Sequence, residues 1–188
     1  MQENPQDDTR DDLMDHLNDI GVVSVLAERH RLEEKVGKSR ARRSLGVIDI
    51  DGGTIYWANV MKEDLSKDSP ERWWVHFGVP NEHKIPKEES VRIKTKRTKA
   101  FPAFGSNAEV KWQGQDQGLG LVKALTANDE ISQLATDLGN IEVRSMSGEF
   151  RGWSIQFDQK VEPTIDHWET LEELAEIHGL GEIIAKHV

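Results

Sequence analysis

The hydrophobic positions of the chain first recur at helical spacing and later alternate. An apolar stripe at three- to four-residue spacing predicts an N-terminal helix: Leu13, Met14, Leu17 and Ile20. Residues 22–36 repeat this spacing and predict a second helix, whose far end is basic. Residues 1–10 offer almost no side chain to bury. We therefore expect a disordered lead-in over residues 1–10 and a helical arm over residues 11–43.

From residue 44 onward the hydrophobic period changes to two, which is typical of strands. Segments with this period predict strands at 45–50, 54–61, 72–77, 91–98, 108–114, 141–146 and 153–157. Most connections between these segments are short. Because parallel neighbours would each need a long crossover, the sequence favours a largely antiparallel sheet.

The predicted sheet has two chemically different faces. Apolar residues alternate with charged or polar ones around Trp112 and Trp153, so one face is a core and the other contacts water. Helical stripes at 130–138 and 167–178 need an apolar surface of matching size. We therefore expect an α+β domain over residues 44–188, with a largely antiparallel sheet whose Trp-rich face is covered by two or three helices.

Composition limits the class of protein. The length of 188 residues suits one domain, and 24 basic against 34 acidic residues give a net charge of -10. Such a chain as a whole repels nucleic acid and anionic lipid, so any anion must bind a local patch. Cysteine is absent, which excludes disulfides and thiolate metal sites and fits a reducing compartment. With no apolar run near membrane length, we expect a soluble cytoplasmic protein that does not associate with membranes.

A basic row is the first candidate binding site. Alternation along the strand predicted at 91–98 places Arg92, Lys94 and Lys96 on one side, and Lys111 extends the row. Such a row could hold phosphates or an acidic protein segment. The alternative is an edge strand that lysines protect from aggregation.

Tryptophan is the second unusual feature, because it occurs six times against a single tyrosine. Five of these residues fall mostly on the predicted core face: Trp57, Trp73, Trp112, Trp153 and Trp168. Core packing is the simplest interpretation. A curved sheet could also leave an apolar pocket lined by these rings for a flat ligand.

The segment 47–54 contains a motif associated with phosphate chemistry. Asp49 and Asp51 resemble the paired acids of Asp-x-Asp-Gly-Thr in haloacid-dehalogenase-like phosphatases, but Gly53 stands where that family has threonine. The segment is also similar to the phosphate-binding hairpin of actin-like sugar kinases, with Asp51 displaced into the turn. Asp-Gly-Gly between two predicted strands indicates a hairpin turn.

No histidine spacing matches a helical metal site, and no nucleophile-elbow string is present. We therefore expect no metal, no cofactor and no catalytic residue. The leading hypothesis is a non-enzymatic binding or protein-interaction module, whose helical arm contacts a protein partner or a second copy of the chain. The alternatives are a nucleic-acid-associated protein that uses local basic patches, and a small-ligand-binding protein or enzyme with a Trp-lined cavity.

Overall fold

One antiparallel sheet organises the chain. In the computed structural model, which describes residues 7–63, 70–81, 86–98, 109–146 and 149–177, eight strands pair in the order β1-β2-β3-β4-β8-β7-β5-β6. The strands are β1 Ser24–Leu26, β2 Arg42–Ile50, β3 Trp57–Glu63, β4 Arg72–Pro80, β5 Arg92–Thr98, β6 Glu109–Gln115, β7 Ile141–Met146 and β8 Gly152–Phe157. All neighbouring pairs are antiparallel. The predicted α+β class with a largely antiparallel sheet is confirmed.

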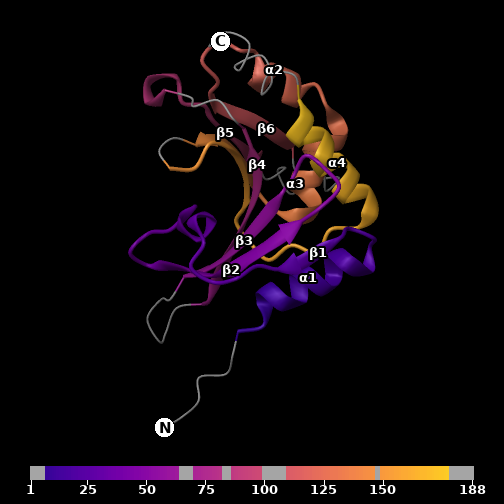
Figure 1. Cartoon of the computed structure of the whole chain (residues 1–188). Helices are drawn as coiled ribbons and strands as arrows, with labels where there is room; N and C mark the ends of the chain where they lie inside the picture. Colours follow the sequence, from indigo (N-terminus) through magenta and orange to yellow (C-terminus); the bar gives the residue numbers. More distant parts are fainter. Residues whose placement is uncertain (1–6, 64–69, 82–85, 99–108, 147–148, 178–188) are drawn as a thin grey trace.

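Helices cover one face of this sheet, as Figure 1 shows for α3 and α4. The described helices are α1 Thr9–Asp19, α2 Leu121–Thr126, α3 Asp129–Leu138 and α4 Ile165–Glu176, with short 3-10 turns η1 Leu32–Lys35 and η2 Lys87–Glu89. The side chain of Asn128 caps α3 by accepting the Ile131 N–H at 3.0 Å. At the start of α4, Thr164 and His167 bond each other's backbone N–H groups, each at 3.2 Å. From the sequence we also expect a short tail helix at 182–187, a segment that lies outside the described residues.

The main core lies between the sheet and these helices. Phe77 packs edge-on against Phe157 and Trp168, with ring centroids 6.0 and 5.7 Å apart. Leu13 and Leu17 of α1 are 4% and 0% exposed and belong to the same apolar cluster. The N-terminal helix therefore shares the core of the sheet.

The prediction of a second helix at 22–36 is wrong. Residues 22–25 are alternately buried and exposed, which is the period of a strand, and β1 pairs with β2 along the edge of the sheet. The rest of this region forms η1 and irregular backbone. Of the predicted lead-in, residues 1–6 lie outside the described residues, while Thr9 and Arg10 begin α1.

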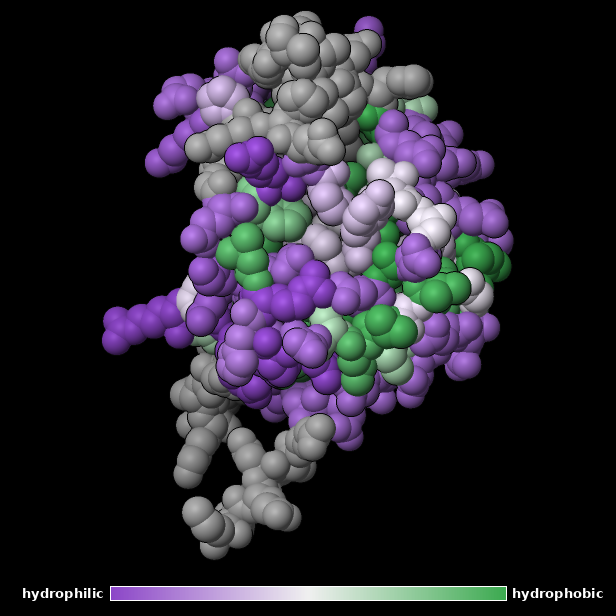
Figure 2. Space-filling view, viewed as in Figure 1, coloured by the Kyte–Doolittle hydropathy of each residue, from purple (hydrophilic) through white to green (hydrophobic). Residues whose placement is uncertain are grey.

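The edge strand β1 is short and its outer side is occupied by a side chain. Asn18 accepts the Ser24 N–H and donates to the Ser24 carbonyl, both at 3.0 Å, as a neighbouring strand would. Val23 and Val25 beside it are 62% and 58% exposed. On the side viewed in Figure 2, hydrophobic residues form only small patches among hydrophilic ones.

Candidate functional site

The sheet face opposite the helices is divided into a covered half and an open half. The connection between β1 and β2, residues 27–41, lies on the far side of the sheet from α4 (Figure 1) and covers β2, β3 and β4. Over β8, β7, β5 and β6 the same face carries polar side chains around a groove. We call this second part the open half.

Asn59 of β3 fixes the covering connection to the sheet. Its fully buried amide nitrogen donates to the carbonyls of Glu33 and Val36, both at 3.1 Å. Its oxygen accepts the Ser44 hydroxyl at 2.6 Å. Trp57 lies under the same connection, where it meets Phe150 edge-on at 5.0 Å.

His76 is the buried titratable group of the covered half. It is 1% exposed, and its Nδ1 atom lies 3.2 Å from the Ser154 hydroxyl. Gly37 rests directly on the ring, so a side chain at that position would overlap the Nε2 atom. Burial lowers the pKa of His76 to about 3, and the Arg144 and Arg42 guanidinium groups add to this effect. The imidazole is therefore neutral at physiological pH.

This buried histidine should make stability fall on acidification. The unfolded chain takes up a proton at this side chain below about pH 6.5, but the folded chain does so only near pH 3. The stability contribution is therefore present above about pH 6.5 and lost as the pH falls, by up to about 1.4 kcal/mol per pH unit. Denaturant unfolding at pH 7 and pH 4 should show a smaller loss for His76→Gln than for wild type. The exposed His30→Gln variant is the control and should behave like wild type; an unchanged loss in His76→Gln would contradict the assignment.

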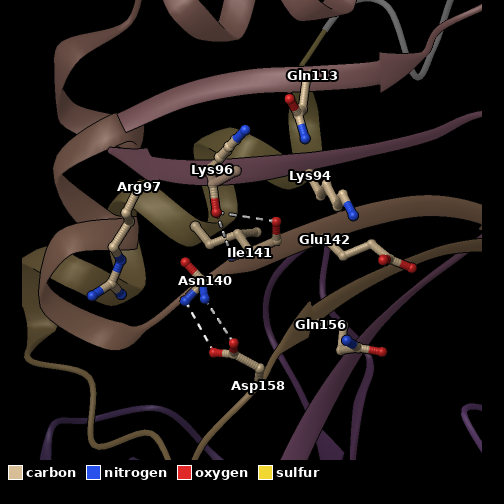
Figure 3. Close-up of a pocket in the computed structure, with 10 residues that line it drawn as sticks. Lys94, Lys96, Arg97, Gln113, Asn140, Ile141, Glu142, Gln156 and Asp158 are labelled. Atoms are coloured by element: carbon tan, nitrogen blue, oxygen red, sulfur yellow. Dashed lines mark hydrogen bonds between the residues drawn. The ribbon is translucent and has the colours of Figure 1, made fainter. Parts of the chain in front are cut away.

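The open half holds a groove of about 520 Å³ (Figure 3). Its floor is one row of facing residues from four adjacent strands: Gln156, Glu142, Lys94 and Gln113. Pairing between β5 and β7 ends at Lys94 and Glu142. Beyond that point the Thr95 hydroxyl accepts the Ile141 N–H at 2.9 Å. The strands diverge there, and the groove lies along the divergence.

Both acidic side chains of the groove are already paired within the protein. Glu142, which is 9% exposed, accepts two hydrogen bonds from Arg92 at 3.0 and 2.9 Å. Asp158 accepts the backbone and side-chain N–H groups of Asn140 at 3.1 and 2.8 Å, as Figure 3 shows. These pairs leave the acids little capacity to attract a cation.

The lysines of the groove are in the opposite situation. Lys94 and Lys96 are exposed, and their ammonium groups make no hydrogen bond or ion pair within the described part of the chain. The carboxamides of the exposed Gln113 and the half-buried Gln156 likewise make no hydrogen bond among the described residues. The groove therefore presents two unpaired cations next to two groups that each donate and accept hydrogen bonds.

The structure places the predicted basic row as follows. Arg92, Lys94 and Lys96 lie on the same face of β5, and Lys111 is the cross-strand partner of Lys96. Arg92 is committed to Glu142, and Lys111 lies 3.3 Å from Glu109. The edge-strand alternative is wrong for β5, because β5 lies between β7 and β6 in the sheet, whereas Lys111 lies on the edge strand β6.

The structure does not bring the five predicted pocket tryptophans together. Trp112, Trp153 and Trp168 belong to the main core, whereas Trp57 lies on the other face under residues 27–41. Trp73 packs at the margin of the core, with the Lys160 ammonium 4.1 Å from its ring centroid. None of these rings lines the groove or the three other pockets described among residues 7–63, 70–81, 86–98, 109–146 and 149–177.

The Asp-Gly-Gly segment connects β2 to β3, as the hairpin interpretation predicts. Asp49 lies within β2 and pairs with Arg31. The loop is held by α4, because the Glu172 carboxylate accepts the Thr54 N–H at 2.7 Å. Across the described ranges, no group of three or more potential ligands could hold a metal ion.

Sequence reasoning missed Gln113, Gln156 and Asn140. Alternation places Gln113 and Gln156 on the polar face, but only the strand order brings them to Lys94.

No helix in the part of the chain that the structure describes is long and apolar enough to cross a membrane. Comparisons with protein-family models, curated proteins and solved structures find no match to the chain.

Proposed function

We propose that this protein is a non-enzymatic binding module whose open half holds an acidic segment of a protein partner. The observation that carries the proposal is the pairing pattern in the groove. Its acids are satisfied internally, while Lys94 and Lys96 have no counter-charge among the residues that the structure describes. Carboxylates of a partner would supply those charges.

The carboxamides favour a peptide over a simple ion. Gln113 and Gln156 each offer a donor and an acceptor on either side of the Lys94 strand. Peptide groups carry the matching N–H and C=O. A segment with acidic side chains would therefore use both kinds of group in the groove.

Nucleic acid is the alternative that the same lysines allow. Single strands need aromatic platforms on which bases stack, and the described lining of the groove contains no aromatic ring. Trp74, on the same face, is occupied by the Arg42 guanidinium at 3.7 Å from its ring centroid. The net charge of -10 adds a general repulsion against long polyanions. These features favour the acidic peptide.

Replacing Lys94 and Lys96 together by Glu should weaken binding of a fluorescein-labelled Glu-rich peptide by more than about tenfold. Both side chains are exposed, so the melting temperature should change little. Fluorescence anisotropy of the labelled peptide measures the affinity. Wild-type affinity should also fall with added salt, because the attraction is screened over about 10 Å at 0.1 M.

The matched control is Lys38→Glu combined with Lys123→Glu, which changes the net charge equally at exposed positions outside the groove. This variant should bind the peptide nearly as well as wild type. A peptide that binds both variants equally would contradict the groove as its site. Oligothymidylate bound more tightly than the peptide, and lost in Lys94→Glu/Lys96→Glu, would establish the nucleic-acid alternative.

A further inference from the structure

A second, smaller cavity lies on the same sheet face, between η1 and the end of β7. Its volume is about 260 Å³. Apolar side chains line it from two sides: Leu32 of η1 and Val36 directly after it on one side, Met146 of β7 and Phe150 on the other. Phe150 in turn packs against Trp57. The cavity therefore has apolar walls that are part of a small apolar cluster of the covered half, which includes Val36, Trp57 and Met146.

Arg144 introduces a positive charge into this apolar cavity. On β7 it pairs across the sheet with Ser154 of β8 on one side and with Arg92 of β5 on the other. It is half-buried and lies on the same sheet face as His76. Within the described ranges its guanidinium has no hydrogen bond or ion pair. Its charge instead disfavours protonation of the neighbouring His76, whose pKa is low. A guanidinium that is partly removed from water without a counter-charge is costly unless an anion satisfies it.

The other charges of the cavity are paired with each other. Lys35 of η1 lies 3.0 Å from Glu149, and both side chains are well exposed, at 66% and 71%. This ion pair joins the two walls where they meet solvent. Because its charges cancel, the anion-binding capacity of the cavity rests on Arg144.

We propose that this cavity is a binding site for a small amphipathic carboxylic acid. The carboxylate would pair with the Arg144 guanidinium, whose planar fork matches it in two hydrogen bonds. The apolar body of the ligand would lie against Val36, Met146 and Phe150. A volume of about 260 Å³ suits a single ring or a short chain. This site is separate from the groove and does not depend on the function proposed for it.

The test uses phenylacetate and its uncharged analogue phenylacetamide with the full chain. Calorimetry should show saturable binding of phenylacetate to wild type, and the amide should bind more than about tenfold more weakly. Arg144→Met should abolish this preference for the acid, and Arg144→Lys should retain part of it. Lys94→Glu/Lys96→Glu should bind phenylacetate as wild type does, which separates this site from the groove.

A second readout locates the ligand. Trp57 touches Phe150, so phenylacetate should change the tryptophan fluorescence of wild type and not that of Trp57→Phe. Equal affinity for the acid and the amide in wild type would overturn the proposal, even if Arg144→Met failed to fold. Absence of saturable phenylacetate binding to folded wild type, or full affinity in a folded Arg144→Met variant, would also overturn it.

Discussion

Deleting residues 1–43 should abolish the cooperative unfolding transition of the remaining chain. Among its described residues, 7–43, five apolar side chains are buried: Leu13, Leu17, Val22, Ala27 and Val36. Burial of a leucine or valine contributes about 1.5–3 kcal/mol, so their sum is comparable to the total stability of about 5–15 kcal/mol that domains have. The deletion also removes β1 and uncovers Trp57 and His76.

This expectation opposes the domain boundary that the change of hydrophobic period favours at residue 44. Thermal melts followed by far- and near-ultraviolet circular dichroism distinguish the two. The control is a chain that starts at Asp7, which retains α1 and should melt as the full chain does. A cooperative melt of residues 44–188 with native near-ultraviolet signal would establish them as an independent domain.

Asn59→Asp should destabilise the protein by at least about 3 kcal/mol, although the side chain keeps its shape. The new carboxylate would be fully buried and would face the carbonyls of Glu33 and Val36, which now accept hydrogen bonds from the amide. Two acceptors and a buried negative charge would repel one another. Denaturant unfolding at pH 7 measures the loss, which should shrink at lower pH as the carboxyl takes up a proton.

Asn128→Asp is the matched control, because it makes the same chemical change at the N-cap of α3. Asparagine and aspartate cap helices about equally well, so its effect on unfolding free energy should be small. An Asn59→Asp variant as stable as this control would show that the carbonyl contacts do not hold residues 27–41 on the sheet.

Local periodicity predicts most of this fold because each strand keeps one side in the core. The segment expected at 141–146 is β7 itself, and 130–138 differs from α3 by one residue at its start. Asn128 stands directly before this apolar stripe and is a residue type that favours the N-cap position, and it caps α3 in the structure. These signals are local, since they depend on burial and hydrogen bonding within a few residues.

The failures arise where distant segments decide the structure. Residues 22–25 alternate between buried and exposed, but four residues are too few to distinguish a strand from the helical spacing around them. This region forms β1 because β2 offers it a free edge with which to pair. Alternation within β3 predicts that Trp57 points to a buried face of the sheet. Whether helices or an irregular connection covers that face depends on residues 27–41, which are distant in sequence. Likewise β5 is interior only because β7 pairs with it across a long stretch of sequence.

The brief pairing between β5 and β7 has a consequence for local stability. The β5–β6 strand pair joins the rest of the sheet through three residue pairs between β5 and β7. Beyond these pairs, the Ile141 N–H donates to the Thr95 hydroxyl instead of to a backbone carbonyl of β5. Segments with few such connections open independently of the whole molecule. A ligand that bridged Lys94 and Gln156 would span this junction, so its binding energy would oppose that opening. Occupancy of the groove would then register as slower amide exchange throughout the β5–β6 strand pair, including residues that the ligand never touches.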